Sequence, residues 1–171
     1  RKDKMTTQND LKRQAARRAL DYLPNDDYIG VGSGSTVSLF IEELVAKKDR
    51  IRGVVAASLE SRELLEKLGI NVVALADVGK LPVYFDGADE VNDTNWLIKG
   101  RGAAMFREKL NIANSPVTYI LADKTKFVRN LGEEAYIPIE CYPEAINSVK
   151  EELLDLGATE IKLRTADHVL Q

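Results

Sequence analysis

The fold is decided by one stretch near the start of the chain, Tyr28-Ile29-Gly30-Val31-Gly32-Ser33-Gly34-Ser35-Thr36. Its apolar first half is typical of a short buried strand, and its second half is a glycine-rich turn. Beyond the turn, apolar residues recur at helical spacing at Val37, Phe40, Ile41, Leu44 and Val45. The stretch therefore predicts a strand, a tight turn and a helix in succession.

The same alternation continues along the chain. Short apolar runs predict strands at 54–58, 72–75, 83–85, 97–98 and 117–122. Helical spacing predicts helices at 10–23, 61–68 and 103–113. Strands that alternate with helices are typical of an α/β fold with a mostly parallel sheet. Ligands bind such sheets beyond the carboxyl ends of the strands, where this chain places its polar clusters.

The pattern changes after Leu131-Gly132. The residues at 135–142 predict a strand, and Pro138 within it favours an edge position. A helix is expected at 143–156, followed by a half-exposed strand at 159–164. We therefore expect two domains, 1–132 and 133–171, and we expect the second, smaller α+β unit to be incomplete in this chain.

Composition narrows the function classes. The chain has 171 residues, 44% of them hydrophobic and 30% charged, with a net charge of −3, which is ordinary for a soluble globular protein. This charge gives no field that favours nucleic acid or an acidic membrane. One Cys and one His are too few for a usual transition-metal site. There is no membrane-spanning run or signal core, so we expect a cytoplasmic protein.

The glycine-rich turn is a candidate anion site. Backbone N–H groups and the helix dipole favour an anion there, and Ser33, Ser35 and Thr36 add hydroxyl donors. It is not a dinucleotide fingerprint, because Ser35 stands at the third glycine position. The turn suits a phosphate monoester. The alternative is a tight turn whose helix is merely capped by Ser35 or Thr36.

Charged clusters follow three other predicted strands. Asp86-Gly87-Ala88-Asp89-Glu90 crowds three carboxylates together, which suits proton transfer, sugar hydroxyls or a divalent cation, or is a solvated acidic turn. Lys99-Gly100-Arg101-Gly102 precedes a helix that carries Glu108, which by itself is more typical of a surface carboxylate. Asp123-Lys124-Thr125-Lys126 supplies cations for a phosphate, or is a solvated loop.

Taken in order, these segments resemble the ribose-5-phosphate isomerase A family along nearly the whole chain. The resemblance is carried by 29–36, 84–90, 99–104 with 107–109, and 122–126. It implies a Rossmann-like catalytic domain over 1–132, with helices flanking a mostly parallel sheet, and a small α+β lid that begins at 133. It also implies an aldose–ketose isomerase of the pentose phosphate pathway, without cofactor or metal, that forms a homodimer or homotetramer.

The resemblance assigns roles to particular residues. Glu108 is implied to be the general base, and Asp86, Asp89 and Lys99 to help open the sugar ring and stabilise an enediolate. The substrate-binding residues that it implies are Gly32, Ser33, Gly34, Ser35, Thr36, Gly100, Arg101, Gly102, Lys126 and Lys12. Ser58 and Ser61 lie in another loop that resembles one near the site.

The chain departs from the family pattern in three ways. Ser33 and Arg101 stand where many members have Thr and Gly, and the family's C-terminal portion is expected to be absent. Two other functions stay open: an amino-sugar phosphate deaminase of similar architecture, and a sugar-phosphate sensor without catalysis.

Overall fold

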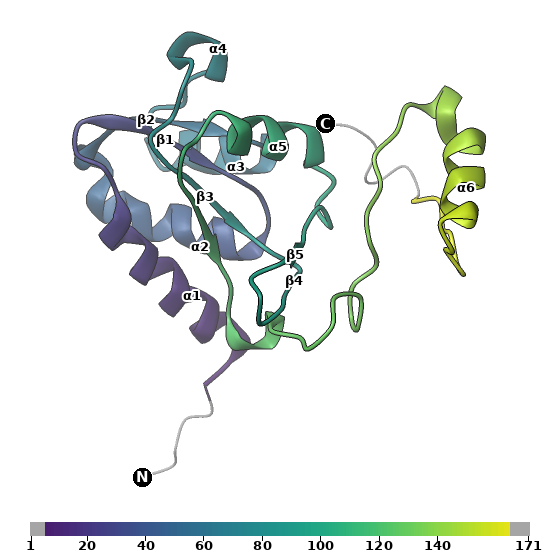
Figure 1. Cartoon of the computed structure of the whole chain (residues 1–171). Coiled ribbons are helices and arrows are strands. Elements are labelled where there is room, and N and C mark those ends of the chain that lie inside the picture. Colours follow the sequence, from purple (N-terminus) through teal and green to yellow (C-terminus); the bar gives the residue numbers. More distant parts are fainter. Residues whose placement is uncertain (1–5, 165–171) are drawn as a thin grey trace.

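A parallel sheet forms the centre of the computed structural model, which describes residues 6–164 (Figure 1). Its four strands lie in the order β2-β1-β3-β6, and every neighbouring pair is parallel. The strands are β1 (Asp27–Val31), β2 (Ile51–Ala56), β3 (Tyr84–Gly87) and β6 (Thr118–Leu121). A separate antiparallel pair joins β4 (Glu90–Val91) to β5 (Leu97–Ile98). The predicted α/β fold with a mostly parallel sheet is confirmed.

Helices flank the sheet. The flanking helices are α1 (Gln8–Ala19), α2 (Ser35–Leu44), α3 (Leu59–Lys67) and α5 (Met105–Ala113), whereas the short α4 (Leu75–Val78) and α6 (Ile146–Asp155) project away from the sheet (Figure 1). Four 3₁₀ turns supplement them: η1 (Leu20–Tyr22), η2 (Val45–Arg50), η3 (Lys124–Lys126) and η4 (Pro143–Ala145). The first helix begins with a capping box in which Thr7 and Asp10 bond each other's backbone N–H groups.

One face of the sheet holds the main hydrophobic core. Ile29 of β1 and Phe85 of β3 are fully buried beneath Phe40 and Ile41 of α2. The rings of Phe40 and Phe85 stack with their centroids 4.8 Å apart. Burial of such aromatic and branched side chains is the main stabilising term of the domain.

The other face carries the polar residues. Successive strand side chains alternate between faces, so Tyr84 and Asp86 point away from the core that holds Phe85. Helix α5 covers this second face, because a Cβ added to Gly30 would lie 3.6 Å from Oδ1 of Asn111. Glu108 and Asn111 are the buried residues of α5. The fold therefore brings Glu108 over the strand that carries Asp86.

Three of the predicted strands are wrong. At 72–75, Val72 forms only an isolated bridge to Val54, and Leu75 already begins α4. The segments at 135–142 and 159–164 are not strands, since neither has a strand partner among residues 6–164. An alternating pattern becomes a strand only when a neighbour pairs with its backbone. Pro138 instead lies against Gly100, where an added Cβ would approach Cγ of Pro138 to 2.8 Å.

The last described part of the chain, 133–164, runs away from the sheet and carries α6 (Figure 1). The predicted helix at 143–156 is present as η4 and α6, but no residue of α6 is buried. Apolar side chains are exposed along this part, including Tyr136, Ile137, Ile139, Tyr142, Leu154, Leu156 and Leu163. Within the described residues, no helix is both long and apolar enough to cross a membrane.

Candidate active site

Asp86 lies at the carboxyl end of β3 with 1% of its side chain exposed. Its Oδ1 accepts hydrogen bonds from the backbone N–H of Gly87 at 2.7 Å and of Ser33 at 3.3 Å. Its Oδ2 accepts one from the hydroxyl of Tyr84 at 2.7 Å and faces Nζ of Lys99 at 2.9 Å. A carboxylate has about four acceptor positions. Protein donors therefore occupy all the acceptor positions of Asp86.

Lys99 follows β5, and its ammonium joins two carboxylates. Nζ lies 2.9 Å from Oδ2 of Asp86 and 3.4 Å from Oε2 of Glu108, and it donates to the carbonyl oxygen of Gly87 at 2.6 Å. The side chain is 19% exposed, whereas both carboxylates are almost fully buried. Lys99 therefore compensates two buried negative charges and keeps some access to solvent.

Glu108 lies in the first turn of α5, and its residue is 5% exposed. Its Oε1 accepts a hydrogen bond of 2.6 Å from the hydroxyl of Ser33. Burial and the negative charge of Asp86 raise the pKa of Glu108, and Lys99 and Ser33 only partly oppose this rise. A carboxylate with a raised pKa is a better proton acceptor at neutral pH, as a general base requires.

A second cluster lies at the start of α2. Its N-cap is Gly34 (φ 92°), and no side chain of the described residues caps the helix, so the alternative of a cap by Ser35 or Thr36 is not formed. Nζ of Lys12 donates to Oγ of Ser35 at 2.9 Å. An uncapped helix N-terminus beside a lysine is favourable to an anion.

Asp123 places a second lysine near this end of the site. Its carboxylate accepts hydrogen bonds from the N–H and the hydroxyl of Thr125. Burial opposes ionisation of Asp123, but the bonds from Thr125 and the charges of Lys126 and Lys12 outweigh it and lower the pKa. The positive charges of both lysines therefore favour the ionised form of Asp123.

The glycine-rich turn links the two clusters. Ser33 bonds Glu108, and Ser35, two residues later, bonds Lys12. Two residues of chain span at most about 7 Å. The turn therefore brings the carboxylate of Glu108 and the ammonium of Lys12 to the same end of the sheet.

The loop after β5 borders the same site. The backbone N–H of Arg101 donates to Oδ2 of Asp89 at 3.0 Å, and a Cβ on Gly102 would lie 3.2 Å from the hydroxyl of Ser33. The guanidinium of Arg164 donates to the carbonyl oxygen of Arg101 at 2.6 Å. Gly100, as described above, lies beneath Pro138. Asp89 and this loop are therefore at the rim of the cluster around Glu108.

Three predicted residues have local structural contacts instead of contacts within the clusters. Thr36 is buried on α2, Ser58 caps α3, and the hydroxyl of Ser61 donates to the carbonyl oxygen of Gly32 at 2.7 Å. Ser61 thus holds the backbone of the glycine-rich turn in place from α3.

Sequence reasoning missed the roles of two residues. Glu90 belongs to the acidic turn in sequence, yet it is buried and accepts hydrogen bonds from the backbone N–H groups of Gly132, Glu134 and Ala135. The sequence pattern predicts Tyr84 as a core residue of a strand, yet its hydroxyl donates to Asp86. The alternation of Tyr84 with Asp86 along β3 was the available signal, because residues two apart share a face.

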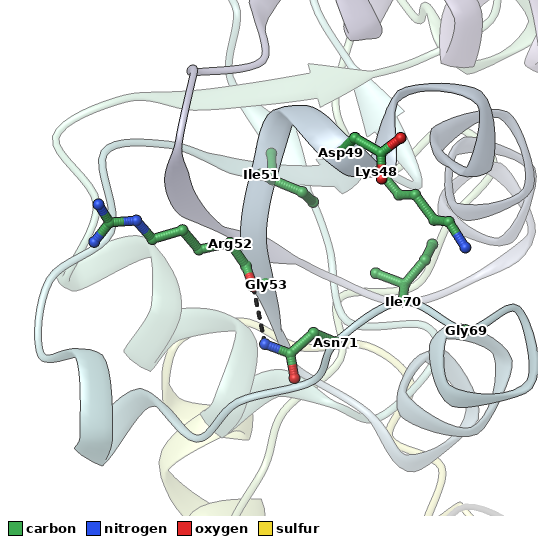
Figure 2. A pocket seen from close by; sticks show the side chains of 8 residues that line it. All are labelled: Lys48, Asp49, Ile51, Arg52, Gly53, Gly69, Ile70 and Asn71. Carbon is green, nitrogen blue, oxygen red and sulfur yellow. Dashed lines mark hydrogen bonds between the residues drawn. The ribbon is translucent and has the colours of Figure 1, made fainter.

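Two cavities lie elsewhere. One, of about 160 Å³, is at the amino end of β2, and its lining includes Lys48, Arg52 and Asn71 (Figure 2). There the amide of Asn71 donates to the carbonyl oxygen of Arg52. The other, of about 260 Å³, lies beside β6 and Phe127. None of the residues predicted for the site lines either cavity, so neither is a candidate for the chemistry.

Comparisons with known proteins show the family of the chain. The family model of ribose 5-phosphate isomerase A (phosphoriboisomerase A) matches residues 53–170. The chain is 44% identical to ribose-5-phosphate isomerase A of Actinobacillus succinogenes over 152 residues, which cover 89% of this chain and 69% of that protein. It belongs to the ribose 5-phosphate isomerase A family.

Solved structures of the ribose 5-phosphate isomerase A family share the fold. The enzyme from Neisseria gonorrhoeae superposes with a TM-score of 0.85 at 43% identity, over 90% of this chain and 68% of that one. A D-ribose-5-phosphate isomerase in complex with phospho-erythronic acid superposes with a TM-score of 0.82 at 34% identity, over 91% and 70%. The family match at 53–170 includes Asp86, Lys99 and Glu108, which meet in the cluster.

Proposed function

We propose that this chain interconverts D-ribose 5-phosphate and D-ribulose 5-phosphate through an enediolate, with Glu108 as the general base. The observation that carries the proposal is the position of Lys99, whose ammonium lies between the buried carboxylates of Asp86 and Glu108. Family membership supports the choice of substrate, because the relatives are named for it.

In the proposed reaction, the carboxylate of Glu108 removes the proton from C2 of the open-chain aldose. The electron pair moves onto the carbonyl oxygen at C1 and gives an enediolate. Glu108 then returns a proton to C1, while the hydroxyl proton at C2 passes to the oxygen at C1, which leaves a ketone at C2. Lys99 supplies positive charge where the negative charge develops. Its partners keep that ammonium in place, so little reorganisation is needed during the reaction.

The phosphate is proposed to bind at the start of α2, with Ser35, Lys12 and Lys126 as its polar partners. The uncapped helix terminus and the Lys12–Ser35 bond support this placement. A relative was solved with phospho-erythronic acid, which is itself a sugar-acid phosphate. Phosphate binding away from the reacting carbons would hold the sugar in a reactive pose.

The oxygens of Asp86 argue for a reaction without a metal at the acidic turn. Their acceptor positions are occupied by Tyr84, Lys99 and backbone N–H groups. A hard cation needs several free oxygen ligands. Asp89, at the rim, is proposed to assist ring opening together with Lys99.

We also propose that residues from 133 onward begin a lid over this site in a cytoplasmic homo-oligomer. Pro138 lies against Gly100, and Arg164 bonds the carbonyl oxygen of Arg101, so both contact the loop that follows Lys99. The exposed apolar side chains of 136–163 are consistent with a unit that packs against further protein.

The test is an isomerase assay on the full chain with ribose 5-phosphate in EDTA, which follows ribulose 5-phosphate directly. Ketose formation in EDTA is the expected result. Loss of activity in EDTA would contradict the metal-free mechanism, and ammonia release from an amino-sugar phosphate would favour a deaminase. Tight binding of ribose 5-phosphate without turnover would favour a sensor.

Glu108→Gln tests the base. It keeps the size of the side chain and removes its basicity, so kcat should fall by about 10² to 10⁴ with little change in fold. Glu63→Gln on α3 is the matched control, because that carboxylate is exposed. Near-normal turnover of Glu108→Gln would remove Glu108 from the base role.

A further inference from the structure

Tyr84 is a fully buried residue of β3 whose hydroxyl points into the polar cluster. The hydroxyl donates to Oδ2 of Asp86 at 2.7 Å. Burial, followed by the negative charge of Asp86, raises the pKa of Tyr84 far above its usual value, so the phenol remains a protonated donor. A buried tyrosine normally gives its hydroxyl a partner. Here the partner is the carboxylate that faces Lys99.

Two glycines, one in β1 and one in the turn after it, leave space for Tyr84 and Asp86. A Cβ on Gly30 would lie 2.7 Å from Cδ2 of Tyr84, and a Cβ on Gly32 would lie 2.0 Å from Cγ of Asp86. Both separations are far below a normal contact between heavy atoms, which is about 3.5 Å or more. Gly30 and Gly32 therefore provide the space in which the ring and the carboxylate lie.

The Tyr84 bond restricts the rotation of Asp86. With Tyr84 and Lys99 on Oδ2, and Gly87 and Ser33 on Oδ1, the carboxylate has donors on both oxygens. Lys99 in turn has three acceptors nearby, the oxygens of Asp86, Gly87 and Glu108. Loss of the tyrosine hydroxyl would leave Lys99 as the partner of Oδ2, so this end of the carboxylate could shift together with the flexible lysine while Oδ1 stays bonded to the backbone.

We propose that Tyr84 is a positioning residue of the isomerase reaction, whose hydroxyl fixes the Asp86 carboxylate and, through it, the Lys99 ammonium beside Glu108. The inference rests on the proposed function for its link to turnover, whereas the fixed position of Lys99 does not depend on it. Tyr84 does not touch the substrate; it acts through Asp86.

The test in turnover is Tyr84→Phe, which removes one oxygen and keeps the ring. A hydrogen bond to a charged group contributes enough that kcat should fall by about tenfold to hundredfold. KM should stay within about twofold, because the phosphate end is untouched. The acid limb of kcat/KM against pH should move to higher pH, because a displaced Lys99 ammonium would oppose the raised pKa of Glu108 less strongly.

Tyr119→Phe on β6 is the matched control, because its ring stacks on Phe85 in the core and lies on the other face of the sheet. This control should keep the kcat and the pH profile of the wild type. Unchanged kcat and acid limb in Tyr84→Phe would overturn the proposal. So would an equal loss of activity in both tyrosine variants, because it would indicate only a packing effect.

A readout without turnover separates this inference from the proposed function. In protein labelled with ¹⁵N-lysine, the Lys99 ammonium should give a slowly exchanging signal, assigned by its absence in Lys99→Met. In Tyr84→Phe that signal should shift and exchange faster, while Tyr119→Phe should leave it unchanged. If the wild type lacks isomerase activity, the proposed function fails, and this signal still decides whether Tyr84 positions Lys99. An unchanged signal in Tyr84→Phe would refute the role of Tyr84.

Discussion

Glu90 is a buried carboxylate with a structural role, unlike the carboxylates of the candidate site. It directly follows the site turn in sequence, yet its side chain is 1% exposed and contacts the segment at 132–135. Its Oε2 accepts from the N–H of Gly132 at 2.6 Å, and its Oε1 accepts from those of Glu134 at 2.6 Å and Ala135 at 2.8 Å. We predict that Glu90→Gln destabilises the fold although it leaves the size of the side chain unchanged.

The magnitude follows from the loss of one acceptor and of the charge. The amide oxygen of Gln can face Glu134 and Ala135, but its NH₂ group then faces the N–H of Gly132. One charge-assisted bond is lost, which costs about 1.5–3 kcal/mol. A buried donor is also left unpaired, at about 1–3 kcal/mol. We therefore expect the free energy of unfolding to fall by about 3 kcal/mol at pH 7.

The dependence on pH has a definite sign. Burial opposes ionisation of Glu90, but the three N–H donors outweigh it, so the pKa lies below the usual 4.5. The stabilisation by its charge is fully present above pH 4.5 and is lost as the pH falls through the lowered pKa. The difference between the wild type and Glu90→Gln should therefore be constant from pH 8 to about pH 5 and shrink below that.

Urea unfolding at a series of pH values measures this difference. Glu134→Gln is the matched control, because it changes an exposed carboxylate of the contacted segment and keeps its backbone N–H. The control should change stability by less than about 0.5 kcal/mol. Equal stability of Glu90→Gln and the wild type at pH 7, or a difference independent of pH down to pH 3, would refute the assigned role of Glu90.

Three further predictions concern the site. Gly32→Ala should lower kcat by at least about 10², because the added methyl group overlaps the buried carboxylate of Asp86; wild-type kinetics would show that Asp86 can move freely. Lys12→Ala should raise KM for ribose 5-phosphate about tenfold and leave kcat nearly unchanged, because it removes a cation beside Ser35; an unchanged KM would place the phosphate elsewhere. Glu108→Gln should be more stable than the wild type at pH 8 and equal to it near pH 4 in urea unfolding. Burial and the charge of Asp86 raise the pKa of Glu108, so its ionisation lowers stability as the pH rises through that value; a variant less stable at pH 8 would contradict this.

Much of the fold could be predicted from local patterns. The run from Tyr28 to Val45 identified β1, the turn and α2, because a buried strand and an amphipathic helix have different hydrophobic periods. The same reasoning failed at 135–142 and 159–164. A strand needs a partner for its backbone, and a local pattern contains no information about whether a partner lies alongside.

The candidate site, too, could be predicted only in part from the sequence. The types of its residues and their order along the chain were readable from the sequence, and with them the chemistry of anion binding and proton transfer. The burial of Glu108, the contact of Lys99 with two carboxylates and the different environments of Asp86 and Glu90 depend on which chain segments face one another. The pKa of a carboxyl depends on its distance from other charges and from water, and only the tertiary structure sets those distances. Local patterns thus predicted an α/β chain with the functional groups of a sugar-phosphate isomerase, whereas the packing of α5 against the polar face of the sheet brings particular groups together.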